Sequence, residues 1–230
     1  SRFDRNRDII KNVTEVVTEG LWQNGSGSLD TFFTGSGTPT QNEYFYSVYN
    51  GDPTDCRYGK QFDVTYGHFS GSGSFSIGGE INDTPSRAIY SQLKLTCLSN
   101  PTAESKFTFG GVETDHVYGI LFNQTKMKSR VDPGNWELHL SGSGGEHLVL
   151  IDDSGDSDES LSTQNAHLTN RTYNVVSGSI VNGIQNTTPY GAFYPDQGII
   201  VIDANYLDAS ASFGTGQNSN SNDDNAYKLF

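Results

Sequence analysis

The densest group of side chains that could do chemistry is an acidic run in the segment IDDSGDSDES. Its carboxylates belong to Asp152, Asp153, Asp156 and Asp158, with Glu159 after them. Closely spaced carboxylates on a glycine-containing loop could wrap Ca²⁺ with oxygen ligands, although the EF-hand spacing of Gly at position six and Glu at position twelve is absent. A solvated acidic loop between two strands explains the same residues. Both hypotheses stay open.

The histidines and cysteines give weaker signals. No His-x-x-His or His-Glu-x-x-His pattern occurs among the five histidines, which are His68, His116, His139, His147 and His167. His139 and His147 flank an expected hairpin and could approach each other across it. Cys56 and Cys97 are isolated, and they could be two buried thiols or one bridge. We predict no zinc site and no cofactor.

Two glycine-serine segments superficially match a nucleophile motif. They are GSGSF at 71–75 and GSGG at 142–145. Neither follows a strand and opens a helix, as a nucleophile elbow requires. No phosphate-binding Gly-Lys-Ser/Thr loop occurs, and nothing picks out a pair of glycosidase carboxylates. The sequence therefore predicts no enzyme and no catalytic residue.

Tyrosines gather on one expected strand, at Tyr44, Tyr46 and Tyr49. They could form a platform on which sugar rings stack. Tyrosine-rich strands more often pack a core edge or a subunit interface, where one end of the ring is apolar and the other is wet.

Composition limits the class of protein. The chain has 13 Phe, 12 Tyr and only one Met, and its 26 Gly follow no period. Aromatic enrichment favours strands, and the glycines then serve turns. The net charge is 14 − 27 = −13, which argues against a nucleic-acid or anionic-membrane partner. No apolar stretch approaches the ~20 residues of a membrane span.

Short aromatic and β-branched runs closed by Gly, Asn, Asp or Ser recur along the chain, and they predict strands. Residues 136–151 predict a hairpin in which Trp136, Leu138 and Leu140 share the buried face. The turn DPGNW before it needs a positive φ at Gly134. The apolar run Ile199–Ile202 predicts a fully buried strand.

One helix is expected at about 85–98. Thr84 could cap its N-terminus, and Pro85 suits the first helical position. Ile89, Leu93 and Cys97 would then share one face. The predicted fold class is mainly β, with sandwich-like antiparallel sheets and this one short α-helix.

Three regions are expected. Residues 1–21 form an N-terminal arm or strand, and residues 22–213 form a β-rich structural domain. Residues 214–230 begin with GTGQNSNSNDDN, which has no apolar residue and predicts a polar linker. The apolar-leaning AYKLF that follows suggests a lead into a further module.

Four blocks together resemble a virion structural protein of contractile-tailed bacteriophages, as in those that infect marine cyanobacteria. They are QFDVTYGHFSGSGS, TPSRAIYSQLKLTCL, RVDPGNWELHLSGSGGEHLVLIDDSGDS and GAFYPDQGIIVIDAN. The resemblance runs from about Trp22 to the C-terminus, and chains of that family continue beyond a point like Phe230. The segment ILFNQTKMKSR departs from it, because a more basic stretch is expected there, so a charged contact could differ.

The resemblance implies a tail or baseplate component without enzymatic activity. It would be assembled in the host cytoplasm and located in the virion, with other tail or baseplate proteins and copies of itself as partners. The alternative is a carbohydrate-binding, lectin-like module whose binding could depend on Ca²⁺ at Asp152 to Glu159. A glycan hydrolase is the third hypothesis.

Overall fold

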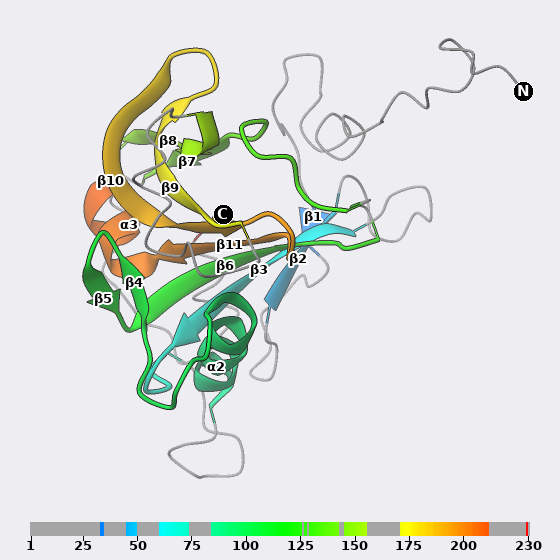
Figure 1. Cartoon of the computed structure of the whole chain (residues 1–230), viewed down its shortest axis with the longest axis vertical. Helices are drawn as coiled ribbons and strands as arrows, with labels where there is room; N and C mark the ends of the chain where they lie inside the picture. The colour runs from blue at the N-terminus through cyan, green and yellow to red at the C-terminus, as the bar shows by residue number, and fades with distance from the viewer. Residues whose placement is uncertain are drawn as a thin grey trace, which may run out of the picture.

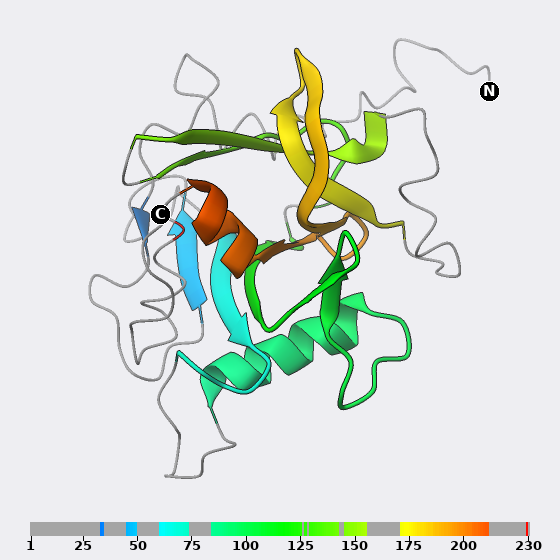
Figure 2. The ribbon, with the colours of Figure 1, turned by 90° about the vertical axis from the view of Figure 1, so that its left-hand side faces the viewer.

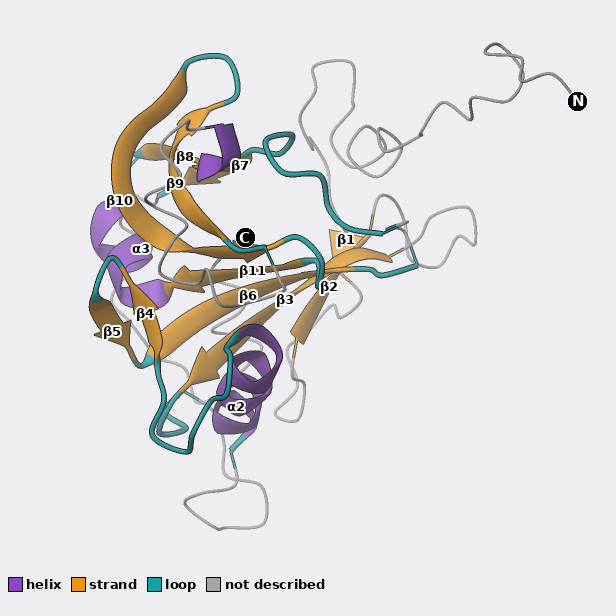
Figure 3. Ribbon diagram, in the orientation of Figure 1, coloured by secondary structure: helices purple, strands orange, loops and turns teal. Residues whose placement is uncertain are grey.

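The protein is mainly β, as predicted. The computed structural model describes residues 33–34, 45–49, 60–73, 84–125, 127, 129–142, 145–155, 171–211 and 229 of the chain. Its main sheet has nine strands, all paired antiparallel, in the order β1-β2-β3-β6-β11-β10-β9-β8-β7 (Figures 1 and 3). In chain order these strands are β1 Phe33–Thr34, β2 Phe45–Tyr49, β3 Lys60–His68, β6 His116–Phe122, β7 Leu138–Ser141, β8 His147–Asp152, β9 Tyr173–Ser179, β10 Gly183–Tyr194 and β11 Ile199–Asp203.

The remaining elements lie outside this main sheet. A two-stranded sheet pairs β4 with β5. Two α-helices and one short 3₁₀-helix complete the elements of the described residues. Their bounds are β4 Phe107–Phe109, β5 Val112–Thr114, α2 Pro85–Cys97, η2 Asp153–Gly155 and α3 Ala204–Ala211.

The main sheet curls on itself, so its two ends share one core. Val48 on β2 and Leu140 on β7, from opposite ends of the strand order, belong to the same buried cluster as Phe193 and Ile200 near the middle. We call this the inner cluster. Strands β7 and β8 accordingly lie across from β2 and β3 (Figures 1 and 2). The sandwich-like character comes from one curled sheet rather than from two separate ones.

A second core, the outer cluster, lies on the other face of the central strands. Helix α2 contributes Tyr90, Leu93 and Cys97, which pack with Phe107 of β4 and Val201 of β11. Strand β11 sends alternate side chains to the two clusters, and all five of its residues are buried. The prediction of a fully buried strand at Ile199–Ile202 is confirmed.

Helix α2 confirms the predicted bounds and corrects one detail. Pro85 is in the first turn, and the helix ends at Cys97. Thr84 is at the N-cap position, but its Oγ1 is buried without a hydrogen-bond partner. That hydroxyl packs against Gly71, where a Cβ would lie only 2.1 Å from Thr84 Oγ1. Packing against this turn therefore replaces the expected capping bond.

Helix α3 follows β11 and was not predicted. Asp203 ends the strand and accepts the backbone N–H groups of Asn205 at 2.9 Å and Tyr206 at 3.2 Å through one oxygen, Oδ1. The same oxygen accepts the hydroxyl of Thr114 at 3.1 Å. An aspartate in this position satisfies free donors of the first helical turn. Leu207 of α3 is then fully buried in the inner cluster.

Candidate interaction site

The β9–β10 hairpin projects from the body of the molecule, and we call its outer part the arm (residues 177–188; Figure 2). Residues 172–195 contain no charged side chain, although the chain has 14 + 27 = 41 of them. At the turn, Gly183 has a φ of +73°, which favours glycine. The N–H of Asn182 donates to Ser179 Oγ at 3.0 Å, so a serine side chain closes the turn.

A large bulge separates the arm from the core. Ser177 pairs with Asn186 and Val175 pairs with Gly191. Two steps along β9 (177 − 175 = 2) therefore face five steps along β10 (191 − 186 = 5). Extra residues on one strand bend it and strengthen its twist. Pro189 lies within the bulge, where its missing N–H breaks no ladder bond.

The arm also has an open sheet edge. Strand β11 pairs with β10 only from Gly191 to Tyr194. Within the described part of the chain, no strand pairs with that edge at residues 183–190. Side chains 185–188, which are Gln, Asn, Thr and Thr, are exposed. An open edge of β-branched and amide residues is a template for a further strand.

The tip of the arm is apolar and exposed. Val181 is 90% exposed and Ile180 is 52% exposed. The backbone N–H of Ile180 donates to Glu137 Oε1 at 2.5 Å, which ties the tip to the residues before β7. The arm thus presents two large aliphatic side chains from an anchored turn.

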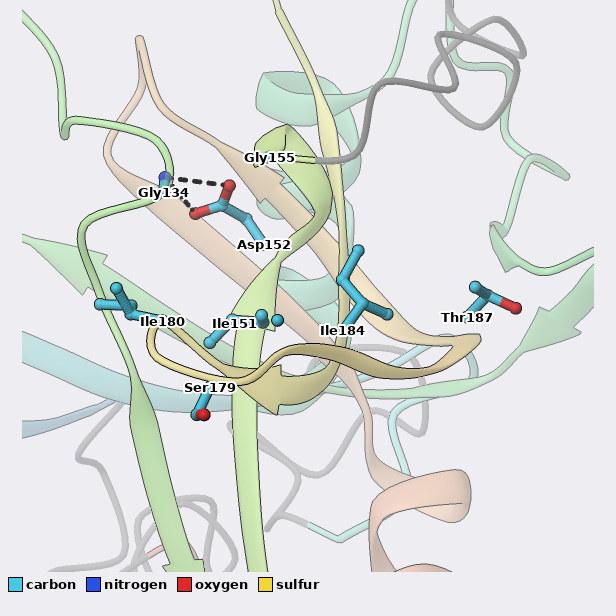
Figure 4. Close-up of a pocket in the computed structure, with 9 residues that line it drawn as sticks. Gly134, Ile151, Asp152, Gly155, Ser179, Ile180, Ile184 and Thr187 are labelled. Carbon is cyan, nitrogen blue, oxygen red and sulfur yellow. Dashed lines mark hydrogen bonds between the residues drawn. The ribbon is translucent and has the colours of Figure 1, made fainter.

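A hollow of about 510 Å³ lies between the arm, the end of β8 and the turn at Gly134. Ile151, Ile180 and Ile184 contribute its apolar wall, and Asp152 lies at one side (Figure 4). The Asp152 carboxylate accepts the N–H of Gly134 through both oxygens, at 3.0 and 2.8 Å. Gly134 has the expected positive φ, +78°. The aspartate therefore holds the DPGNW turn in place.

The two described members of the acidic run serve the scaffold. Asp152 also accepts the N–H of Ser154 at 3.1 Å. Asp153 accepts the backbone N–H and the side-chain amide of Asn174, each at 2.8 Å. Burial raises the pKa of Asp153, and the hydrogen bonds from Asn174 oppose that shift. Asp156, Asp158 and Glu159 lie outside the described residues, and the described ones contain no metal-binding group of three or more His, Cys, Asp or Glu.

The predicted hairpin at 136–151 brings His139 and His147 together, with ring centroids 5.5 Å apart. His139 Nε2 also lies 2.8 Å from Glu137 Oε2. Leu140 and Trp136 face the inner cluster, as predicted. This histidine pair lies on an exposed face, where it forms surface contacts.

A second histidine pair was not predicted. His68 at the end of β3 is in register with His116 at the start of β6, and the ring centroids are 4.4 Å apart. His68 Nδ1 accepts the N–H of Ser70 at 3.0 Å. Burial and, to a smaller extent, nearby His116 lower the pKa of His68 to about 4, against an opposing effect of Asp115. His167 lies outside the described residues.

Of the other sequence candidates, the structure describes the side chains of Cys97 and Tyr49, which lie on different elements, α2 and β2. Cys97 is free and buried, and burial raises the pKa of its thiol to about 12, so it stays protonated. Cys56 and Tyr44 lie outside the described residues. The side chain of Tyr46 is likewise not described, whereas that of Tyr49 is half-buried.

The glycine-serine segments belong to turns. In GSGSF, residues 71–73 form a turn beside the start of α2, and its last two residues lie outside the described part. In GSGG, residues 142 and 145 close the β7–β8 hairpin, because the N–H of Gly145 donates to Gly142 O at 3.0 Å. Neither described part opens a helix in the manner of a nucleophile elbow.

Sequence reasoning thus missed the arm. Its signal was the absence of charge over residues 172–195, together with the aliphatic pair Ile180 and Val181 at a turn. Among the described helices, none combines the length and apolar character needed to cross a membrane. Comparisons with known protein families, with curated proteins and with solved structures found no match to this chain.

Proposed function

We propose that this chain is a structural subunit that works through protein–protein contacts, in the tail or baseplate of a contractile-tailed bacteriophage. Within the proposal it is assembled in the host cytoplasm and has no enzymatic role. The observation that carries the contact function is the exposed aliphatic tip at Ile180 and Val181. The placement in a phage particle comes from the resemblance of the four sequence blocks.

The tip supports a contact function because its exposure has no structural benefit. Fully burying a valine or isoleucine side chain is worth roughly 1.5–3 kcal/mol. Val181 stays almost wholly in water, and Ile180 keeps about half of its surface exposed although it lines the hollow. Exposed aliphatic groups on a hydrogen-bonded turn, with polar uncharged neighbours, resemble the apolar centre and polar rim of a protein interface.

The scaffold role of Asp152 and Asp153 also supports a structural subunit. Their carboxylates accept hydrogen bonds from the backbone at Gly134, Ser154 and Asn174. Oxygens engaged in this way are poorly available to a cation or a sugar hydroxyl. The lectin-like alternative therefore draws no support from these two residues.

The test uses particles of the phage that encodes the chain. Antibodies raised against the purified protein should label tails or baseplates in electron micrographs, at a fixed number of copies per particle. Particles that lack the chain would contradict the proposal, as would a chain recovered only free in the lysate.

A matched pair of variants tests whether the exposed aliphatic tip makes the contact. Val181→Asp should reduce incorporation into particles at least tenfold, because it places a charge at the apolar tip. Leu95 is 69% exposed on helix α2, away from the arm, so Leu95→Asp adds the same charge elsewhere and should leave incorporation unchanged. Equal incorporation of the two variants would remove the tip from the contact.

A further inference from the structure

The arm has the properties of a contact between two copies of the chain. We propose that two copies pair through their arms, the open edge of each β10 lying antiparallel to the same edge of the other across a twofold axis. This inference rests on the proposed contact function, and it names the surface and the partner. It uses the segment from about Ile184 to Thr188 and the tip at Val181.

Charge favours a second copy as the occupant of this edge. Each copy has a net charge of −13, so two copies repel unless they meet where charge is absent. Residues 172–195 are the uncharged segment that the fold presents on a projecting hairpin. The Glu137 carboxylate lies at the tip, and its Oε1 already accepts the N–H of Ile180.

Backbone geometry favours an antiparallel partner of the same sequence. In a twofold pair each strand offers the other the same donors and acceptors, so the contact is self-complementary. The turn at Gly183 limits the paired segment on one side, and Pro189 limits it on the other because it has no N–H. The Asn186 side chain already accepts the N–H of Thr188 at 3.0 Å, so only a few ladder bonds can form.

The tip adds the apolar part of the contact. Antiparallel pairing places the Val181 tip of each copy beside the base of the other arm. Thr187, near that base, lines the rim of the hollow (Figure 4). A short ladder with one aliphatic anchor per copy is a small interface, so we expect a reversible dimer with a Kd on the order of 10–100 µM.

Sedimentation velocity of the full chain, from micromolar to several hundred micromolar concentrations, tests the pairing. The wild type should shift from monomer to dimer, and Val181→Asp should raise the Kd at least tenfold. Leu95→Asp, on helix α2, should leave the Kd unchanged, and circular dichroism should show all three proteins folded. A wild type that stays monomeric overturns the pairing, as does a dimer that Val181→Asp leaves intact.

Cross-linking tests the geometry. With Cys56→Ser as background and buried Cys97 retained, Gln185→Cys lies in the middle of the paired edge and should give cross-linked dimers with a short bismaleimide. Leu95→Cys, exposed on helix α2, should give at least tenfold fewer. Equal yields from both positions would overturn the twofold arrangement.

The two proposals can fail separately. If the chain is monomeric but Val181→Asp still prevents incorporation into particles, the pairing is wrong and the contact function stands with another protein as partner. If the chain dimerises through the arm but is absent from particles, the pairing stands and the virion assignment is wrong.

Discussion

The two halves of strand β10 differ in their strand pairing and in their burial. The inner half, Gly191–Tyr194, pairs with β9 on one side and β11 on the other, and every residue is buried. The outer half, from Gly183 to the bulge, pairs with β9 alone and is mostly exposed. One continuous strand therefore contributes both to the core and to a projecting surface.

The bulge before Gly191 separates these two roles. It ends the pairing with β11 and bends the chain away from the sheet, so the outer half leaves the two hydrophobic clusters. Substitutions in the inner half should therefore change the free energy of unfolding. Substitutions in the outer half should change association instead.

The largest effect should come from Gly191→Ala. A Cβ at this position would lie 2.0 Å from Val201 O and 2.8 Å from Ile202 Cα, and both are backbone atoms of the neighbouring strand. The sheet must separate locally to admit the methyl group, so we expect the free energy of unfolding to fall by about 5 kcal/mol. Urea denaturation followed by fluorescence measures it.

Gly183→Ala, in the outer half of the same strand, is the control. No atom lies within 4 Å of its added Cβ, and only the φ of +73° is unfavourable. The expected cost is about 1 kcal/mol. Equal losses for the two variants would mean that the halves of β10 are not distinct.

Phe193→Ala should have the next largest effect. Phe193 is fully buried in the inner cluster, with its ring 5.4 Å from that of Trp136. The cavity left by the ring should lower the free energy of unfolding by about 4 kcal/mol. Val181→Ala, at the exposed tip, should change it by less than about 0.5 kcal/mol. A loss above 1 kcal/mol for Val181→Ala would show that the tip is part of the folded core.

A smaller effect should appear on acidification, and it belongs to the core. Burial lowers the pKa of His68 from 6.5 to about 4, so the unfolded chain binds more protons between these values. Stability from His68 is therefore complete above pH 6.5 and is lost as the pH falls toward 4, by about 2.5 kcal/mol at pH 4.5.

His68→Gln isolates this effect, because glutamine keeps an acceptor for Ser70 without titrating. Asp153 and Asp203 have raised pKa values through burial and act in the opposite direction, but they are present in both proteins. Urea midpoints at pH 4.5, 5.5 and 7.5 should show a steeper acid loss for the wild type. Parallel pH profiles would remove His68 from the explanation.

Apart from the control variants, the smallest effect should come from Asp152→Asn, where the hollow meets the turn at Gly134. Asparagine keeps one acceptor for Gly134 but loses the charge that strengthens the bonds. We expect a loss of about 1 kcal/mol, measured by urea denaturation. The same variant also sharpens the comparison, because a scaffold residue should leave the dimerisation constant of the arm unchanged.

Features governed by neighbours in sequence could be predicted. Three such features are Pro85 in the first turn of α2, the positive φ of Gly134 and the β7–β8 hairpin. Each depends on residues within a single turn or hairpin. Helix α3 was missed although its cap is local, because the Asp203 carboxylate accepts the N–H groups of residues only two and three positions later. Asp203 directly follows the apolar run Ile199–Ile202, and the strand signal hid the helix start.

The acidic run shows a different limit at the candidate site. The sequence places Asp152 and Asp153 side by side, and their chemistry suits either a cation or the backbone. Which one they bind depends on Gly134, 18 residues earlier, and on Asn174, 21 residues later. No spacing rule specifies such partners.

By itself the sequence determined a β-rich chain, the position of α2, the buried run Ile199–Ile202 and an uncharged stretch at 172–195. These follow from local backbone preference and from the types of side chain. Only the tertiary structure decided that the sheet curls around one inner cluster, that His68 meets His116 and that half of β10 leaves the core. The physical reason is that burial and pairing are set by strands far apart in the chain, and here the bulge before Gly191 decides where that pairing stops.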